Sequence, residues 1–228
     1  MALSDWDIYR LNAGSVVEIS TSTPLAGTAS LRLARGAVPA SNAWRDNLVP
    51  KNPGSLSPVG VLRGAVACCV RVHTGYTVDG GAPHYLALLC LQSHRDMVQS
   101  GAKTAYALCL GATATGGITS AALVAFGTEL AYPLPVALWS TTLTPSLAKG
   151  QLGTFELEWD ANVAYSGIRF TIRRGSQSGY TDLTVLHEMV HPLGTLPTTS
   201  LGEGPALISN SVDTVNFEVR LDQWRLRA

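Results

Sequence analysis

Charged side chains are scarce in this chain of 228 residues. They make up 14% of the sequence, against about 25% in an average soluble protein. The 16 basic and 16 acidic residues cancel, and neither a basic excess nor a basic stripe is present, so we expect no nucleic-acid partner. So little charge favours either contacts between subunits or a strand-rich protein that buries both faces of its sheets.

The sequence also lacks a long apolar run and a targeting segment. Residues 105–128 carry no charge, but the motif GATATGG at 111–117 interrupts them. This interruption favours a hairpin over a membrane-spanning helix of about 20 apolar residues. The opening residues MALSDWD lack the basic and apolar regions of a signal peptide. We therefore expect no membrane association, and synthesis in a reducing cytoplasm.

Cysteine is rare, and its spacing does not match that of a zinc site. The four residues are Cys68, Cys69, Cys90 and Cys109. Each lies in an apolar, strand-like run, which predicts buried and reduced thiols. Cys68 and Cys69 are adjacent, so on a strand they point to opposite faces and cannot bind one metal together.

Short alternating runs separated by Gly, Pro, Ser and Asn are abundant, and they predict β-strands. The predicted strands span residues 15–20, 29–34, 62–73, 84–92, 105–110, 121–126, 155–159, 168–173, 183–187, 206–209 and 215–227. No internal repeat or polar linker divides the chain, which predicts one domain over residues 1–228. Residues 36–60 and 132–150 contain several prolines and are predicted to be long loops, either functional or in contact with another subunit.

The order of these runs resembles the concanavalin-like lectin, glucanase and laminin-G superfamily. The resemblance rests on HYLALLCLQ at 84–92, GTFELEWD at 153–160, IRFTIR at 168–173, GEGPALI at 202–208 and VNFEVRLDQWRLR at 215–227. It implies an all-β, two-sheet antiparallel jelly-roll sandwich. The superfamily includes lectins, glycosidases, carbohydrate-binding modules and structural domains of tailed-phage particles, so the fold alone does not select a function.

The segment HEMVH at 187–191 matches the HExxH motif of zinc peptidases, in which two histidines lie one helical turn apart. The helix that this motif needs conflicts with Pro192, and the residues before His187 are predicted to form a strand. On a strand, His187 and His191 share a face about 13 Å apart, too far to bind one ion. We therefore interpret His187, Glu188 and His191 as a chance match and expect no metal.

Glu156, Glu158 and Asp160 alternate along a predicted strand and so share one face. They resemble the strand of laminarinase-type glycosidases, whose nucleophile and general acid need carboxyl groups about 5–5.5 Å apart. The order of Glu and Asp departs from that pattern, and few aromatic residues flank it. We favour the interpretation that these carboxylates form the hydrated face of a half-buried strand, and we expect no catalytic residue.

Aromatic residues make up only 7% of the chain, but two tryptophans, Trp44 and Trp139, fall in the predicted loops. Tryptophan in a loop suits a protein interface or a platform on which a sugar ring stacks. We favour the interface and keep the glycan platform as the alternative. No motif indicates a cofactor. Three arginines, Arg169, Arg173 and Arg174, form the one tight basic group.

These features lead us to predict a non-enzymatic virion structural protein of a tailed phage: a decoration, adaptor or tail-associated subunit assembled in the host cytoplasm. Such a subunit is expected to form a homo-oligomer and to bind a neighbouring capsid or tail protein. The alternative is a lectin-like module that binds carbohydrate. A glycosidase using Glu156 and Glu158, or a zinc peptidase using His187 and His191, ranks below both.

Overall fold

The computed structural model describes residues 3–10, 15–22, 24–35, 44–51, 63–72, 84–92, 94–95, 104–113, 117–126, 136–161, 167–192, 204–208 and 217–227. These residues form fourteen strands and one short 3₁₀ helix, η1. In chain order the elements are η1 (Leu3–Asp5), β1 (Trp6–Arg10), β2 (Ser15–Ser20), β3 (Ser30–Arg35), β4 (Trp44–Pro50), β5 (Arg63–Val72), β6 (His84–Cys90), β7 (Ala105–Ala112), β8 (Ile118–Phe126), β9 (Val136–Leu147), β10 (Gly153–Asp160), β11 (Gly167–Gly175), β12 (Thr184–Pro192), β13 (Gly204–Ile208) and β14 (Phe217–Arg227).

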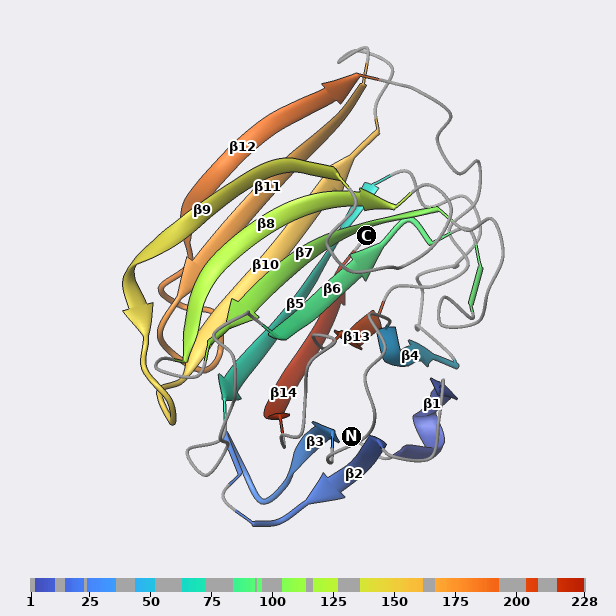
Figure 1. The fold of residues 1–228 in the computed structure, drawn as a ribbon, viewed down its shortest axis with the longest axis vertical. Helices are drawn as coiled ribbons and strands as arrows, with labels where there is room; N and C mark the ends of the chain where they lie inside the picture. The colour runs from blue at the N-terminus through green and yellow to red at the C-terminus, as the bar shows by residue number, and fades with distance from the viewer. Residues whose placement is uncertain are drawn as a thin grey trace.

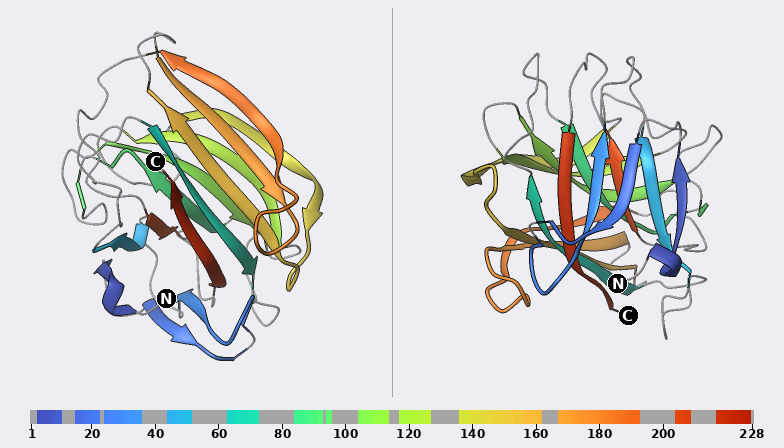
Figure 2. Two further views of the ribbon diagram at one scale, coloured as in Figure 1. Left: turned by 180° about the vertical axis from the view of Figure 1, so that it is seen from behind. Right: turned by 90° about the horizontal axis from the view of Figure 1, so that it is seen from below.

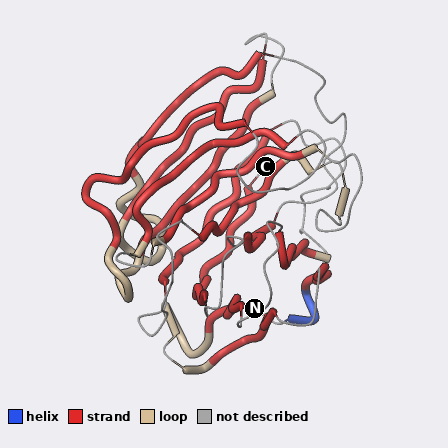
Figure 3. Tube along the Cα trace, in the orientation of Figure 1, coloured by secondary structure: helices blue, strands red, loops and turns tan. Residues whose placement is uncertain are grey.

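The strands form two antiparallel sheets that pack face to face (Figure 1). The first sheet has the order β1-β4-β13-β6-β7-β8-β9, and the second has the order β12-β11-β10-β5-β14-β3-β2. Figure 2 shows the second sheet from its outer side, and Figure 3 shows that strands make up nearly all of the regular structure. The chain therefore has the all-β, two-sheet antiparallel sandwich that the sequence predicted.

The core between the sheets comes from side chains that alternate along the strands. On β10, Phe155, Leu157 and Trp159 are at most 2% exposed and point inward. Full burial of such a side chain contributes roughly 1.5–3 kcal/mol. The partner strand β11 adds Phe170 and Ile172 to the same core.

The central strands of the first sheet are buried on both faces. Along β7 every residue is buried; Leu108 and Leu110 enter the core between the sheets, while Ala107 and Cys109 join a second apolar cluster on the opposite face. This two-sided burial explains the uncharged stretch at 105–128, of which the described part is the β7–β8 hairpin. The predicted hairpin is confirmed.

The two long segments predicted to be loops each contain a strand, so the prediction was wrong for residues 44–50 and 136–147. Residues 36–43, 52–60 and 132–135 lie outside the described part of the structure. Residues 136–147 form β9, which contains Pro145. β9 ends the first sheet, and an edge strand tolerates proline because one side of its backbone needs no hydrogen-bond donor. Residues 44–50 form β4, where Asn47 is buried and donates a hydrogen bond to the Arg95 carbonyl oxygen at 2.9 Å. Because the polar residue Asn47 occupies a buried position, the apolar alternation that predicts a strand is interrupted here.

Trp44 and Trp139 consequently lie in strands and not in loops. Trp44 is the first residue of β4, and its side chain lies outside the described part of the structure. Trp139 lies within β9 at the edge of the first sheet. The cysteine prediction holds: all four thiols are free and buried, with Cys68 in the core between the sheets.

Candidate functional site

The outer face of the second sheet carries the three carboxylates of β10. As predicted, Glu156, Glu158 and Asp160 share this face, opposite the core side chains of the same strand. Their interpretation as a hydrated face was wrong, because Glu156 is only 1% exposed and Asp160 only 7%. Buried carboxylates need hydrogen bonds or ion pairs, and arginines of the neighbouring strands supply them.

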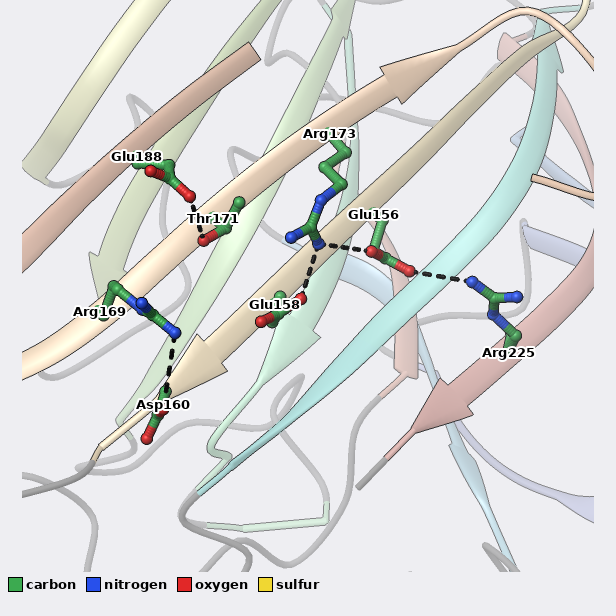
Figure 4. Close-up of polar contacts among 8 residues, drawn as sticks. All are labelled: Glu156, Glu158, Asp160, Arg169, Thr171, Arg173, Glu188 and Arg225. Carbon is green, nitrogen blue, oxygen red and sulfur yellow. Dashed lines mark hydrogen bonds and ion pairs between the residues drawn. The ribbon is translucent and has the colours of Figure 1, made fainter. Parts of the chain in front are cut away.

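Arg173, directly opposite Glu156 on β11, joins two of the carboxylates (Figure 4). Its Nη1 donates to Glu156 Oε1 and to Glu158 Oε2, both at 2.7 Å. Burial lowers the pKa of Arg173, but the hydrogen bonds to Glu158 and Glu156 outweigh this and raise it above its ordinary value. Arg173 is therefore a permanent cation that fixes both glutamates.

Arg225 holds the other oxygen of Glu156 from the opposite side. This residue of β14 lies in register with Ala67 of β5, and Ala67 is in register with Glu156. Its Nη2 donates to Glu156 Oε2 at 3.2 Å, across the short alanine side chain. The Arg225 guanidinium also lies 4.5 Å from the centroid of the Tyr180 ring, a distance typical of a cation–π interaction.

Tyr180 and Gln223 position Arg225. Tyr180 precedes β12 and has a φ of 61°, and its hydroxyl donates to the Gln223 carbonyl oxygen. Gln223 lies in the bulge of β14 with a φ of 51°, and its Oε1 accepts hydrogen bonds from Gly179 N at 2.6 Å and from Cys69 Sγ at 3.3 Å. The bulge and the segment before β12 therefore brace the face between them.

Two further contacts continue this polar face toward β12. Arg169 Nη2 lies 3.7 Å from Asp160 Oδ2, and Thr171 donates to Glu188 Oε1 at 3.2 Å. The face therefore presents carboxylates, guanidinium groups and a hydroxyl over β12, β11, β10 and β14. Of the predicted basic group, Arg169 and Arg173 take part in it.

The HEMVH segment lies in strand β12, as predicted. His187 and His191 are in register with the core residues Ile172 and Ile168 of β11, so they face inward, whereas Glu188 faces outward beside Thr171. The two imidazoles contact different aromatic residues, Trp139 and Tyr106. The side chains of His187, Glu188 and His191 therefore do not converge on one site.

Trp139 is stacked against His187, with ring centroids 4.6 Å apart and planes 7° from parallel. One face of the indole ring is therefore covered by the imidazole. At the other end of the sandwich, Trp6 and Trp224 meet edge to face with centroids 5.7 Å apart. Both aromatic pairs join the two sheets.

Within the described ranges, no group of three or more His, Cys, Asp or Glu side chains is arranged to bind a metal ion. Across those same residues, no helix is long and apolar enough to span a membrane.

The sequence matches no protein-family model and no curated protein. Solved structures do match. An endo-β-1,4-glucuronan lyase from the fungus Trichoderma reesei is similar with a TM-score of 0.62 and 12% identity, over 100% of this chain and 92% of the lyase. The exoplasmic/lumenal domain of VIP36, in its Ca²⁺/Man₃GlcNAc-bound form, has a TM-score of 0.51 and 11% identity, over 97% and 84%. The catalytic domain of a glycoside hydrolase family 131 protein from Coprinopsis cinerea has a TM-score of 0.52 and 10% identity, over 98% and 83%.

At these identities the comparisons establish the fold, which is that of concanavalin-like lectins and glycan-active enzymes. Of the three proteins named above, two are glycan-active enzymes and one was solved with a bound glycan, so they give no support to a virion role. The tailed-phage context, the homo-oligomer and the capsid or tail partner therefore stay predictions from the sequence.

Arg225, Tyr180 and Gln223 are site residues that sequence reasoning missed. Arg225 and Glu156 are 69 positions apart, and only the pairing of β14 and β10 with β5 brings them together. No local pattern in the sequence signals such a contact. The run of β14 predicted the strand but not its bulge.

Proposed function

We propose that this protein is a glycan-binding domain without catalytic activity, and that the glycan binds the outer face of the second sheet around Glu156. The observation that carries the proposal is the fixed ion-pair array: Arg173 and Arg225 each hold one oxygen of a glutamate that is 1% exposed. An array of this kind offers acceptors and donors in a constant arrangement. Because its side chains are already ordered, binding costs less conformational entropy.

The residues around Glu156 remain accessible to a ligand. Arg225 has a side chain that is 41% exposed, and the side chains of Arg173 and Glu158 are 24% and 21% exposed. A guanidinium fork donates two parallel hydrogen bonds, and a carboxylate accepts two. The exposed parts of Arg225, Arg173 and Glu158 suit neighbouring hydroxyls on a sugar ring. The buried Glu156 holds the two arginines in place.

The outer face of the first sheet suits a glycan poorly. Its central positions are buried apolar residues of β6, β7 and β8, including Leu89, Ala107 and Val124. Such side chains offer no hydrogen bond to a hydroxyl. The polar face of the second sheet is therefore the better candidate, and the glycan-bound form of the similar VIP36 domain supports a ligand of this class.

The test is affinity electrophoresis and calorimetry of the purified protein against a panel of neutral and acidic polysaccharides. We expect at least one polysaccharide to slow the migration of the protein through the gel. Glu158→Gln should bind about tenfold more weakly, which corresponds to roughly 1.4 kcal/mol and is close to the lower end of the contribution of a hydrogen bond to a charged group. Ser140→Ala, at an exposed position of β9 in the first sheet, is the matched control. No binding across the panel, or equal affinity in both variants, contradicts the proposal.

A glycosidase is the second candidate, and one distance favours it. Glu156 Oε1 and Glu158 Oε2 both lie 2.7 Å from the same nitrogen, so they are no further apart than about 5.5 Å, the separation of a retaining pair. Against this, both oxygens of Glu156 accept hydrogen bonds from arginines. Glu156 is also only 1% exposed, so a sugar reaches neither oxygen unless the side chains around it move. Release of reducing ends by the protein, lost in Glu156→Gln, would favour the enzyme.

A further inference from the structure

We propose that three arginines on the outer face of the second sheet, Arg32, Arg220 and Arg71, form an anion subsite for the carboxylate or sulfate group of an acidic glycan. They are in register on β3, β14 and β5, with Arg220 directly opposite both of the others. Like charges directly opposite on neighbouring strands destabilise a sheet. The inference rests on the proposed glycan-binding function and names the class of glycan.

Two glutamates partly compensate this row. Glu218 Oε2 accepts from Arg32 Nε at 2.9 Å and lies 2.8 Å from Arg32 Nη2, and Glu18 Oε1 accepts from Arg32 Nη1 at 2.9 Å. The hydrogen bond to Glu218 raises the pKa of Arg32, and it outweighs the opposing effect of burial. Arg32 is therefore fully engaged with carboxylates at one end of the row.

Arg220, at the centre of the row, is less well compensated. It is 4% exposed, and its ion pair is to Glu218, with Nε 2.8 Å from Oε1. Its Nη1 is buried and has no acceptor among the described residues. A buried cationic donor left without an acceptor is costly. An anion bound at the row would supply the missing oxygen to Nη1 of Arg220.

The buried arginine nitrogens that lack an acceptor in the described part of the chain all belong to β14. They are Nη1 of Arg220 and Nε of Arg225, whereas Nε of Arg220 is ion-paired with Glu218 Oε1 at 2.8 Å. Arg225 also holds Glu156, so the row and the site around Glu156 share one strand and one face. Five positions along a strand span roughly 15 Å, so one bound oligosaccharide can contact both places.

A guanidinium group recognises a carboxylate or a sulfate through paired hydrogen bonds, whereas a neutral hydroxyl leaves its charge uncompensated. The row therefore selects sugars that carry an anionic group. Arg220 itself is 4% exposed, so an anion reaches it by displacing the side chain of Arg32, which lies directly opposite and is 28% exposed. Uronates and sulfated sugars share this chemistry.

The experiment compares binding of the full chain to polygalacturonate, to the same polymer with its carboxylates methyl-esterified, to dextran sulfate and to dextran. We expect polygalacturonate or dextran sulfate to bind at least tenfold more tightly than the ester and dextran, with affinity falling as salt rises. The polymer that binds distinguishes a carboxylate from a sulfate. Arg220→Lys keeps the charge but loses the fork, and it should reduce the preference for the anionic polymer at least fivefold.

The control is Arg95→Gln, which removes an arginine paired with Asp7 away from this row and should leave the preference unchanged. If Arg220→Lys does not fold, Arg71→Gln decides, and an unchanged preference in that variant overturns the inference. Equal binding of esterified and free polymer also overturns it, while leaving the proposed glycan binding intact. Absence of binding to all four polymers overturns both.

Discussion

The indole ring of Trp139 lies flat on the imidazole of His187, with centroids 4.6 Å apart. Trp139 belongs to the edge strand of the first sheet and His187 to the edge strand of the second, so the pair joins the two sheets at one side of the sandwich. His191, on the same face of β12, contacts Tyr106 with centroids 5.8 Å apart. Both histidines of the HEMVH segment therefore take part in packing between the sheets.

Replacing Trp139 by alanine should lower the free energy of unfolding by about 2–3 kcal/mol, somewhat less than for a fully buried tryptophan, because the ring is only partly buried. His187→Ala should cost less. The double variant should lose less unfolding free energy than the two single variants together, by about 0.5–1.5 kcal/mol, which is the coupling typical of stacked rings. Urea denaturation followed by circular dichroism measures all three values. Strict additivity would contradict the stacking contribution.

The geometry of β12 also leads to a prediction about zinc. On a strand the His187 and His191 side chains are separated by roughly 13 Å along the chain, and Glu188 lies on the other face. We expect protein equilibrated with zinc and then desalted to retain no stoichiometric metal, and its melting temperature to be the same with and without a chelator. His191→Ala is the matched control. One zinc per chain that disappears in this variant would restore the metal-site interpretation.

Strand positions were largely predictable because alternation of apolar residues reports burial of one face. β2 begins and ends where the sequence predicts, and β10 extends the predicted 155–159 by a few residues at its ends. The sequence missed β1 and β4, at one end of the first sheet, and β9, at its other end. Edge strands bury less surface and tolerate polar residues and proline, so their pattern is weak.

The candidate site was predictable in its carboxylates but not in its electrostatics. The alternation of Glu156, Glu158 and Asp160 places them on one face whatever lies opposite. Which cations compensate them depends on strand order, and the antiparallel pairing that brings Arg225 beside Ala67 follows from the fold as a whole. The burial of Glu156 could not be deduced from its own strand.

The ion pairs of Glu156 predict an asymmetry between two substitutions. Arg173→Ala removes the nitrogen that holds both Glu156 and Glu158, and leaves a carboxylate that is 1% exposed with one guanidinium fewer. We expect a loss of about 2–3 kcal/mol in unfolding free energy, below the full value for a buried pair because Arg173 itself is partly exposed. Glu156→Gln keeps the shape and one hydrogen-bonding oxygen and should cost about 1 kcal/mol.

The measurement for this pair is urea unfolding, with Glu188→Gln as a control. Glu188 is exposed on the same face and accepts from Thr171, and its substitution should change stability by less than about 0.5 kcal/mol. A larger loss for Glu156→Gln than for Arg173→Ala would show that the carboxylate, and not the arginine, organises the site.

Cys69 predicts a loss of stability at alkaline pH. Burial raises the pKa of this thiol to about 11, whereas an unfolded chain has a cysteine pKa of about 8.5. The thiol is neutral in both states below about pH 8.5, so its contribution to stability is complete there. Between about pH 8.5 and 11 the unfolded chain releases the proton and the folded chain keeps it, so folding free energy is lost as pH rises. The expected loss is on the order of 3 kcal/mol.

The variant Cys69→Ala isolates this effect from the other buried thiols and tyrosines, because it removes one titrating group and leaves the rest. The difference in unfolding free energy between the natural chain and the variant, measured in urea at steps from neutral pH to about pH 11, should shift against the natural chain only above about pH 8.5. A thiol reagent should leave Cys69 unmodified in the folded protein at neutral pH and modify it in urea. Parallel stability curves for the two proteins across this range would mean that the Cys69 thiol is not shielded by the contact with Gln223 and the segment before β12.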